Sequence, residues 1–184
     1  MLMTMRAYIE AARGVAFLDA AAVDAEASHP DEQGRKRGGE RAAILTPVVK
    51  GWCTDLGVEL SSIAVQVHGG MGFVEETGVA QHYRDARINP IYEGTNGIQA
   101  LDLLARKLPL DGGRVALELF ADVDKTADEA AQGGQATAEM GAALKTASAT
   151  VQATTTKLLE RLSSEPADAF AGATPYLTLS LIHI

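Results

Sequence analysis

Apolar residues recur every three to four positions over much of the first part of the chain. Residues 1 to about 28 carry one such stripe, formed by Met1, Met5, Ile9, Ala12 and Ala16. Residues from about 40 to 67 carry a second stripe, formed by Ile44, Val48, Trp52, Leu56, Leu60 and Ile63. This spacing places apolar side chains on one face of a helix, so the pattern predicts two amphipathic helices.

Proline and glycine interrupt the two stripes. The polar segment from Ser28 to Gly39 contains Pro30 and a glycine pair, which predicts a loop or a frayed helix end. Pro47 lies within the second stripe, so either the helix is kinked there or Pro47 belongs to its first turn. The glycines from Gly69 to Gly72 predict the end of the second helix.

The following segment predicts a short helical stretch and then a further helix. A turn is expected at Asn89-Pro90, and Thr95 can cap the N-terminus of a helix that reaches about Leu108. Asp111-Gly112-Gly113 then predicts a hinge, after which Ala, Thr, Gln and Glu become common. Weak helical periodicity continues at Leu117, Phe120, Leu144, Val151, Leu158 and Leu162.

These patterns predict a helical domain over residues 1–108, a hinge over 109–113 and a smaller helical extension over 114–170. Residues 171–184 fit neither helical part. Their apolar end, from Tyr176 to Ile184, is too short to span a bilayer and resembles translated adapter or vector sequence, so we expect a non-native tail. The alternative is a true terminal strand.

Composition supports an all-α chain of ordinary globular type. Hydrophobic residues make up 47% and aromatic residues only 5%, with abundant alanine. The formal net charge of -8 argues against a nucleic-acid partner. No apolar run approaches the roughly 20 residues of a membrane span. The four histidines, His29, His68, His82 and His183, lack metal-ligand spacing, so no metal site is expected.

The start of the chain lacks the pattern of a signal peptide. Cys53 is the one cysteine, which excludes an intrachain disulfide and suits a reducing compartment; we therefore expect a cytoplasmic protein. The residue types favour a small buried apolar role for Cys53 over a reactive thiol.

The segment from Gln66 to Gln99 concentrates the polar detail of the chain. The Arg84-Asp85-Ala86-Arg87 run predicts surface or interface ion pairs, with ligand contact as the alternative. Glu93 stands between Tyr92 and Gly94, just before the predicted helix. An acid there can complement the helix dipole, or it can be a general base held in an apolar pocket.

Three parts of this segment together resemble the C-terminal signature of the acyl-CoA dehydrogenases: Gln66 to Phe73, Tyr83 to Ile88 and Ile91 to Gln99. The resemblance covers residues 1 to about 108 as the family's C-terminal four-helix domain. Met3 to Tyr8, Val49 to Gly57 and the helical region after Gly113 resemble a larger bacterial branch of that family.

The resemblance implies FAD as cofactor and an acyl-CoA as substrate. It implies that Glu93 removes the α-proton of the thioester while the β-hydrogen leaves as hydride, and that the backbone amide of Glu93 helps to polarise the thioester carbonyl. Gly94 would line the acyl-CoA pocket. The FAD contacts it implies are Gln66, Gly69, Gly70, Thr95 and Asn96, the first three toward a neighbouring subunit. Several family members carry a glutamine where Gly97 stands here, so one flavin contact is either missing or supplied by Gln99.

The resemblance also implies an electron-transfer flavoprotein as partner and a homodimer or homotetramer. The family's N-terminal helical domain and central β-domain have no counterpart here, so we expect a C-terminal piece of a protein roughly three times longer, inactive when isolated. The competing hypothesis is a stand-alone helical oligomerisation module without catalysis. A related flavoprotein, such as an acyl-CoA oxidase or a DNA-damage-response relative, is a third.

Overall fold

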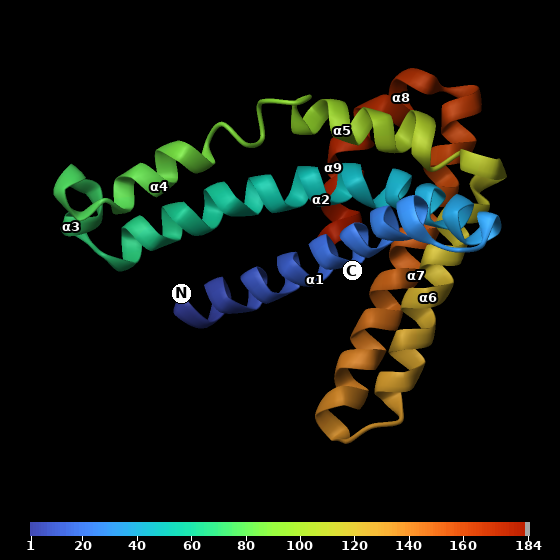
Figure 1. The fold of residues 1–184 in the computed structure, drawn as a ribbon, viewed down its shortest axis with the longest axis horizontal. Helices are drawn as coiled ribbons and strands as arrows, with labels where there is room; N and C mark the ends of the chain where they lie inside the picture. The colour runs from blue at the N-terminus through green and yellow to red at the C-terminus, as the bar shows by residue number, and fades with distance from the viewer. Residues whose placement is uncertain (183–184) are drawn as a thin grey trace. The chain divides into compact units, whose positions relative to one another are not determined.

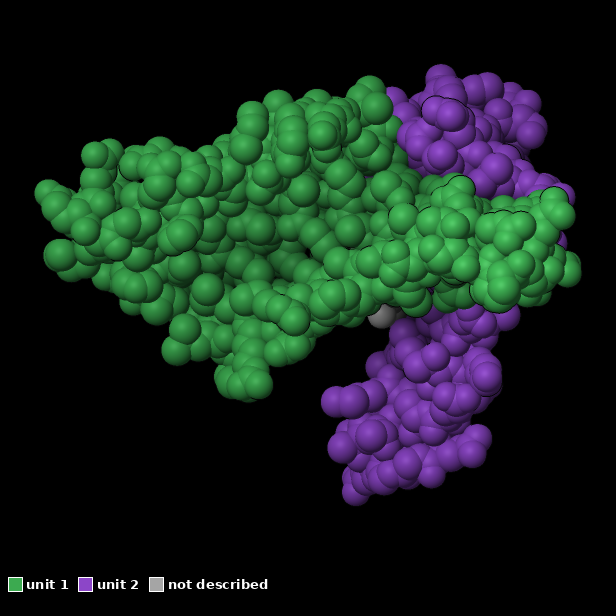
Figure 2. All heavy atoms as spheres, in the orientation of Figure 1, with its two compact units in different colours: residues 1–99 green, residues 100–184 purple. Residues whose placement is uncertain are grey.

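The computed structural model describes residues 1–182, and every regular element in that range is helical. This confirms the all-α prediction. Figure 2 shows two compact units, unit 1 over residues 1–99 and unit 2 over residues 100–184.

Unit 1 is built on a pair of long helices. Helix α1 covers Leu2–Ser28 and helix α2 covers Glu32–Val67, joined by a connection of three residues so that they lie side by side in opposite directions (Figure 1). The buried residues of the pair include Ala22, Ala42, Ile44, Leu45, Val48 and Leu56. Ile9 of the predicted α1 stripe is 45% exposed. The apolar face of α1 is therefore only partly covered in this chain.

Helix α2 begins eight residues earlier than the predicted residue 40, so the loop predicted between Ser28 and Gly39 is wrong over residues 32–39. Asp31 caps the helix, since its carboxylate accepts a hydrogen bond from the Gly34 N–H at 3.1 Å. A Cβ atom on Gly38 would lie 2.5 Å from the Glu26 backbone nitrogen. Glycine at this position therefore permits close packing of the two helices. The sequence alone does not distinguish a glycine with this role from a glycine in a loop.

Pro47 lies in the interior of α2, and the helix continues across it. The alternative that placed Pro47 in a first turn is wrong, because the helix begins fifteen residues earlier, at Glu32. Pro47 is buried. It has no N–H to donate to the preceding turn.

The glycine turn ends α2 as predicted, with Gly69 at φ 60°. Short helices follow: α3 over Gly70–Phe73, η1 over Glu75–Thr77 and α4 over Val79–Ala86. After a turn, α5 covers Asn96–Asp102 and continues as a π-helical turn, η2, over Leu103–Lys107. The predicted turn at Asn89-Pro90 and the helix to about Leu108 are thus confirmed.

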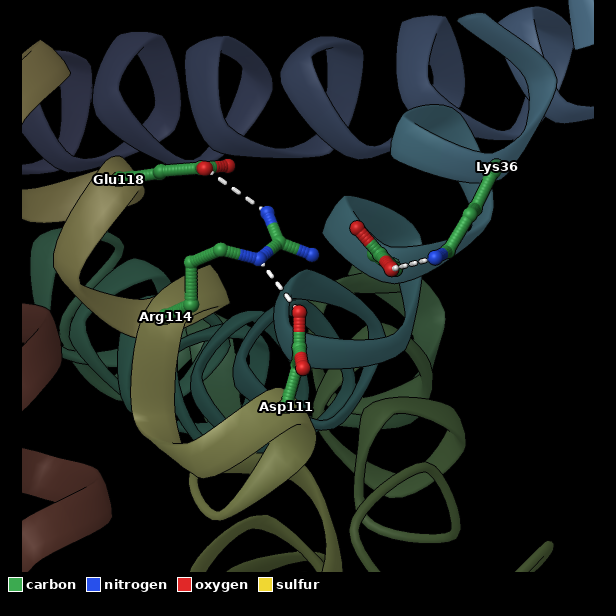
Figure 3. Close-up of polar contacts among 5 residues, drawn as sticks. Lys36, Asp111, Arg114 and Glu118 are labelled. Carbon is green, nitrogen blue, oxygen red and sulfur yellow. Dashed lines mark hydrogen bonds and ion pairs between the residues drawn. The ribbon is translucent and has the colours of Figure 1, made fainter. Parts of the chain in front are cut away.

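Unit 2 contains a second antiparallel pair. After the short helix η3 (Leu110–Gly113), α6 covers Arg114–Ala131 and α7 covers Gln135–Ser164, and the two pack side by side (Figure 1). Arg114 lies between two carboxylates, with Nε 2.6 Å from Asp111 Oδ2 and Nη1 2.7 Å from Glu118 Oε1 (Figure 3). These ion pairs join the predicted hinge to the first turns of α6.

Of the positions that carry the weak periodicity, Phe120 and Val151 are buried in unit 2, whereas Leu117 is 61% exposed. Helix α8 covers Pro166–Ala171 and α9 covers Ala173–Ile182, so the terminal-strand alternative is wrong up to residue 182. Tyr176 and Leu177 of α9 are buried. The expected non-native tail thus includes residues that pack into unit 2, and its last two residues, 183 and 184, lie outside the described part.

Candidate functional site

The turn between α4 and α5 carries Glu93 in an unusual backbone conformation. Glu93 has φ 54° and Gly94 has φ 84°, so two consecutive residues are left-handed. Glycine adopts this conformation freely, but for a residue with a Cβ it costs roughly 1–2 kcal/mol. Such strain persists only where surrounding contacts maintain it, and it is found often at functional sites.

Two side chains hold this turn by its carbonyl oxygens. Gln99 Nε2 donates to the carbonyl oxygen of Glu93 at 3.2 Å. Lys50 Nζ, from the middle of α2, donates to the carbonyl oxygen of Gly94 at 2.8 Å. Both peptide groups that follow the strained residue are therefore fixed from outside the turn.

Asn96 links the start of α5 to the same part of α2. Its Oδ1 accepts a hydrogen bond from Lys50 Nζ at 2.9 Å. Its Nδ2 donates to the Gly51 carbonyl at 2.9 Å and to Thr54 Oγ1 at 3.0 Å. The side chain of Asn96 is thus bound to α2 through both its oxygen and its nitrogen.

The carboxylate of Glu93 is free of such contacts. The residue is exposed, and among residues 1–182 its side chain makes no hydrogen bond or ion pair. No hydrogen bond of the described chain uses the backbone N–H of Glu93 either. The apolar pocket expected around Glu93 is not formed by these residues, and both its carboxylate and its amide remain open to a ligand.

Thr95 forms the predicted helix cap. Its carbonyl accepts from the Gln99 N–H at 3.0 Å, and its Oγ1 accepts from the Ile98 N–H at the longer distance of 3.4 Å. The residue is exposed. Thr95 therefore stands at the exposed N-terminus of α5, two positions after Glu93.

Gln66, Gly69 and Gly70 form a separate group at the C-terminal end of α2. All three are exposed, and a Cβ atom on either glycine would meet nothing within 4 Å. Gln66 is sixteen positions beyond Lys50, or about 24 Å along a helix. The structure of unit 1 therefore divides the predicted site residues into two groups, one around Glu93 and one at this glycine turn.

A cavity of about 510 Å³ lies beside the glycine turn. It is lined by apolar and polar residues of α2, α3, η1 and α4, including Ser62, Val65, Phe73, Tyr83 and Arg84. Two of its lining residues form an ion pair, with Arg84 Nη2 3.2 Å from Glu75 Oε1. Arg84 thus makes a surface ion pair, as the first of the two alternatives for the Arg-Asp-Ala-Arg run predicted, whereas Asp85 accepts from Gln81 at 2.6 Å.

Cys53 is half-buried, and burial raises the pKa of its thiol. Its sulfur lies 3.9 Å from the Ala12 carbonyl oxygen across the α1–α2 pair. This is a packing position, as expected. Over residues 1–182 the structure contains no cluster of three or more His, Cys, Asp or Glu side chains that could hold a metal ion, and no helix long and apolar enough to cross a membrane.

The polar contacts of Lys50 and Thr54 with Asn96 were not anticipated from the sequence. A lysine between Val49 and Gly51 fits the polar face of an amphipathic helix, so the local pattern carries no sign of its role. Its contact with Gly94 spans 44 positions of the chain and depends on the tertiary fold.

The geometry defines an all-helical domain with an accessible acid on a strained turn before a helix. Residues 1–108 match the family model described as acyl-CoA dehydrogenase, C-terminal domain, and residues 119–180 match the one described as acetyl-CoA dehydrogenase C-terminal like. The chain belongs to the acyl-CoA dehydrogenase family.

Individual relatives agree with this placement. The chain is 46% identical over 180 residues to 3-methylmercaptopropionyl-CoA dehydrogenase of Ruegeria pomeroyi, covering 98% of this chain and 30% of that protein. It is 30% identical to a butyryl-CoA dehydrogenase of Syntrophomonas wolfei, over 67% of this chain and 20% of that protein. The first of these matches confirms the resemblance to the larger bacterial branch.

The fold agrees with a solved structure. The crystal structure of Caenorhabditis elegans ACDH-11 in complex with C11-CoA matches with a TM-score of 0.67 at 22% identity, covering 98% of this chain and 30% of that one. The chain thus spans 30% of the length of both that protein and the Ruegeria relative.

Proposed function

We propose that this chain is the C-terminal portion of an FAD-dependent acyl-CoA dehydrogenase, which converts an acyl-CoA thioester to the enoyl-CoA. The observation that carries the proposal is Glu93. It stands on a left-handed turn at the N-terminus of α5, with its carboxylate and backbone N–H both open, within a domain that belongs to this family.

In the proposed reaction the Glu93 carboxylate removes the proton from the α-carbon of the thioester. The Glu93 N–H donates to the thioester carbonyl oxygen, which stabilises the negative charge that develops there. Gly94 lines the acyl-CoA pocket beside it. The α-proton goes to the carboxylate, the β-hydrogen leaves with its electron pair, and a carbon–carbon double bond forms. Bound FAD supplies the oxidising power by accepting that hydride.

The described residues fit FAD in part. Gln66, Gly69 and Gly70 are exposed and the glycines have open space above their Cα atoms, so backbone groups there can approach a cofactor closely. Thr95 is exposed at a helix N-terminus, a position that suits an anionic or polar group. Asn96 and Gln99 also remain proposed contacts. The Asn96 side chain already binds α2, and the Gln99 side chain already binds the Glu93 carbonyl. We therefore propose that these two residues contact the cofactor through backbone groups of the first turn of α5.

The remaining expectations follow from the family. We infer a homodimer or homotetramer in which Gln66, Gly69 and Gly70 face the cofactor of a neighbouring subunit. The reduced cofactor would pass its electrons to an electron-transfer flavoprotein. A cytoplasmic location is proposed separately, because a single cysteine suits a reducing compartment. Exposed apolar side chains on α1, such as Leu2, Met3 and Phe17, support a larger assembly.

The test is the substitution Glu93→Gln in the complete dehydrogenase. Because Gln has nearly the same shape but cannot accept the α-proton, turnover of acyl-CoA should fall by roughly 10²–10⁴-fold while flavin content stays unchanged. Glu59→Gln is the matched control, since Glu59 is an exposed glutamate on α2. Unchanged turnover in Glu93→Gln would show that another group is the base.

The second candidate is a helical oligomerisation module without catalysis. The observation that favours it is the partly uncovered apolar face of α1. It predicts a stable, colourless oligomer of this chain alone, whose oligomeric state and stability are unchanged by Glu93→Gln.

A third candidate is an oxidase with the same base. It would consume oxygen when given acyl-CoA, which an oxygen electrode measures directly.

A further inference from the structure

Lys50 makes two hydrogen bonds that have no role in the reaction proposed above. Its ammonium group, half-buried on α2, donates to Gly94 O at 2.8 Å and to Asn96 Oδ1 at 2.9 Å. Hydrogen bonds from a charged donor are stronger than those between neutral groups. One side chain of the long helix thus holds both the strained turn and the first residue of α5.

The other contacts of the turn are local. Gln99 reaches Glu93 O from six positions along the chain, and the Asn96 N–H donates to Pro90 O at 3.2 Å. Such bonds shape the turn but do not fix where it lies on the domain. The hydrogen bonds that tie it to α2 come from Lys50, together with Asn96, which also binds Gly51 and Thr54.

We propose that Lys50 is a positioning residue, which fixes the Glu93 carboxylate by holding Gly94 O and Asn96 Oδ1 against the middle of α2. The inference rests on the proposed function, because it takes Glu93 as the base. Lys50 acts through the backbone that follows Glu93. A base must stay within hydrogen-bond reach of the carbon-bound proton, and a misplacement of about 1 Å can cost on the order of 100-fold in rate.

A set of matched variants tests this proposal. Lys50→Met keeps the length and the apolar stem of the side chain but removes the ammonium. Lys36→Met is the matched control: Lys36 lies on the same helix, its side chain is 70% exposed, and it pairs only loosely with Glu40 at 3.7 Å (Figure 3). Thr54→Val is a milder change that removes the Thr54 hydroxyl from Asn96 and leaves Lys50 intact.

The first readout needs no turnover. Hydrogen–deuterium exchange is measured on the 184-residue chain for the peptide covering residues 88–99. Lys50→Met should exchange at least about tenfold faster there than Lys36→Met, because a charged hydrogen-bond partner is lost. Thr54→Val should show a smaller increase, and Lys50→Arg, which keeps the charge and the donors, should recover most of the protection.

The second readout is kinetic and uses the complete dehydrogenase. Lys50→Met should lower kcat by roughly 10- to 100-fold with KM and flavin content nearly unchanged, since the base is displaced while binding remains. Equal exchange in Lys50→Met and Lys36→Met would overturn the proposal, as would faster exchange with an unchanged kcat.

Two further outcomes keep the test decisive. If Lys50→Met does not fold, Lys50→Gln, which removes the charge but keeps a polar side chain, takes its place, and exchange at residues 88–99 equal to that of Lys36→Met overturns the proposal. If Glu93→Gln turns over normally, the proposed function fails and the catalytic part of this inference fails with it. The exchange result then still shows whether Lys50 anchors the turn, so the two failures remain distinguishable.

Discussion

At the scale of single residues, Glu93 combines an exposed acid with a backbone conformation that suits glycine. Its φ of 54° predicts that Glu93→Gly makes the chain more stable, by roughly 0.5–1 kcal/mol, because relief of the left-handed strain exceeds the added chain entropy of glycine. The midpoint of urea unfolding measures this. The same variant of the complete dehydrogenase should be inactive, which would show that the strain at this position accompanies function.

Glu76→Gly is the control at this scale, since Glu76 is an exposed glutamate whose φ is not positive. There glycine brings no relief and only adds entropy to the unfolded chain, so a loss of up to about 1 kcal/mol is expected. A loss of stability in Glu93→Gly as large as in Glu76→Gly would mean that Glu93 is not strained.

At the scale of elements, the packing of α1 on α2 depends on Gly38. A Cβ atom there would lie 2.5 Å from the Glu26 nitrogen and 2.8 Å from the Ala22 oxygen, which are backbone atoms that cannot move without shifting a helix. Gly38→Ala should therefore destabilise the chain by roughly 1–3 kcal/mol. Gly57→Ala, in the same helix with nothing within 4 Å, should stabilise it by up to about 1 kcal/mol. Chemical denaturation of both variants checks the opposite signs.

The same glycines illustrate which features of the fold can be predicted from the sequence and which cannot. Periodicity predicted the long helices because it depends on neighbours three and four positions away, and the glycine turn at Gly69 was found because backbone conformation is local. Gly34 and Gly38 were assigned to a loop, because the sequence does not show whether a glycine is needed for close helix packing or for a turn. Glu93 and Thr95 were located from local sequence and resemblance. The Lys50 contact was missed because it depends on how α2 meets a turn 44 positions away.

At the scale of the whole molecule, α9 contributes to unit 2 through Tyr176, whose hydroxyl lies 2.7 Å from Thr155 Oγ1. Burial raises the pKa of Tyr176 to about 12, although the hydrogen bond to Thr155 lowers it in part. The unfolded chain ionises this phenol at about pH 10, so the unfolded state binds fewer protons between the two values and stability falls there. The loss should be about 1 kcal/mol between about pH 9 and about pH 11.

Tyr176→Phe removes this titration, so the wild-type chain should lose more stability than the variant over that pH range. The comparison subtracts the other groups that titrate in alkali. It also bears on the expected non-native tail. Equal pH dependence in the two chains would mean that α9 is not packed in solution. A difference of the expected size would assign at least Tyr176 to the folded unit, in keeping with the family model that extends to residue 180.

The exposure of Glu93 bears on the activity that we expect of this chain alone. The chain spans 30% of the Ruegeria relative, and the described residues leave Glu93 exposed rather than enclosed in an apolar pocket. A base without that enclosure lacks the water-excluded site that proton abstraction next to a thioester requires. We therefore predict that the purified 184-residue chain is colourless and does not oxidise acyl-CoA. Flavin absorbance and a dye-reduction assay measure both properties, and a yellow, active preparation would contradict the prediction.

Light scattering on the same sample then separates the remaining hypotheses. A discrete colourless oligomer would favour the interaction module. A monomer would indicate that assembly needs the rest of the dehydrogenase.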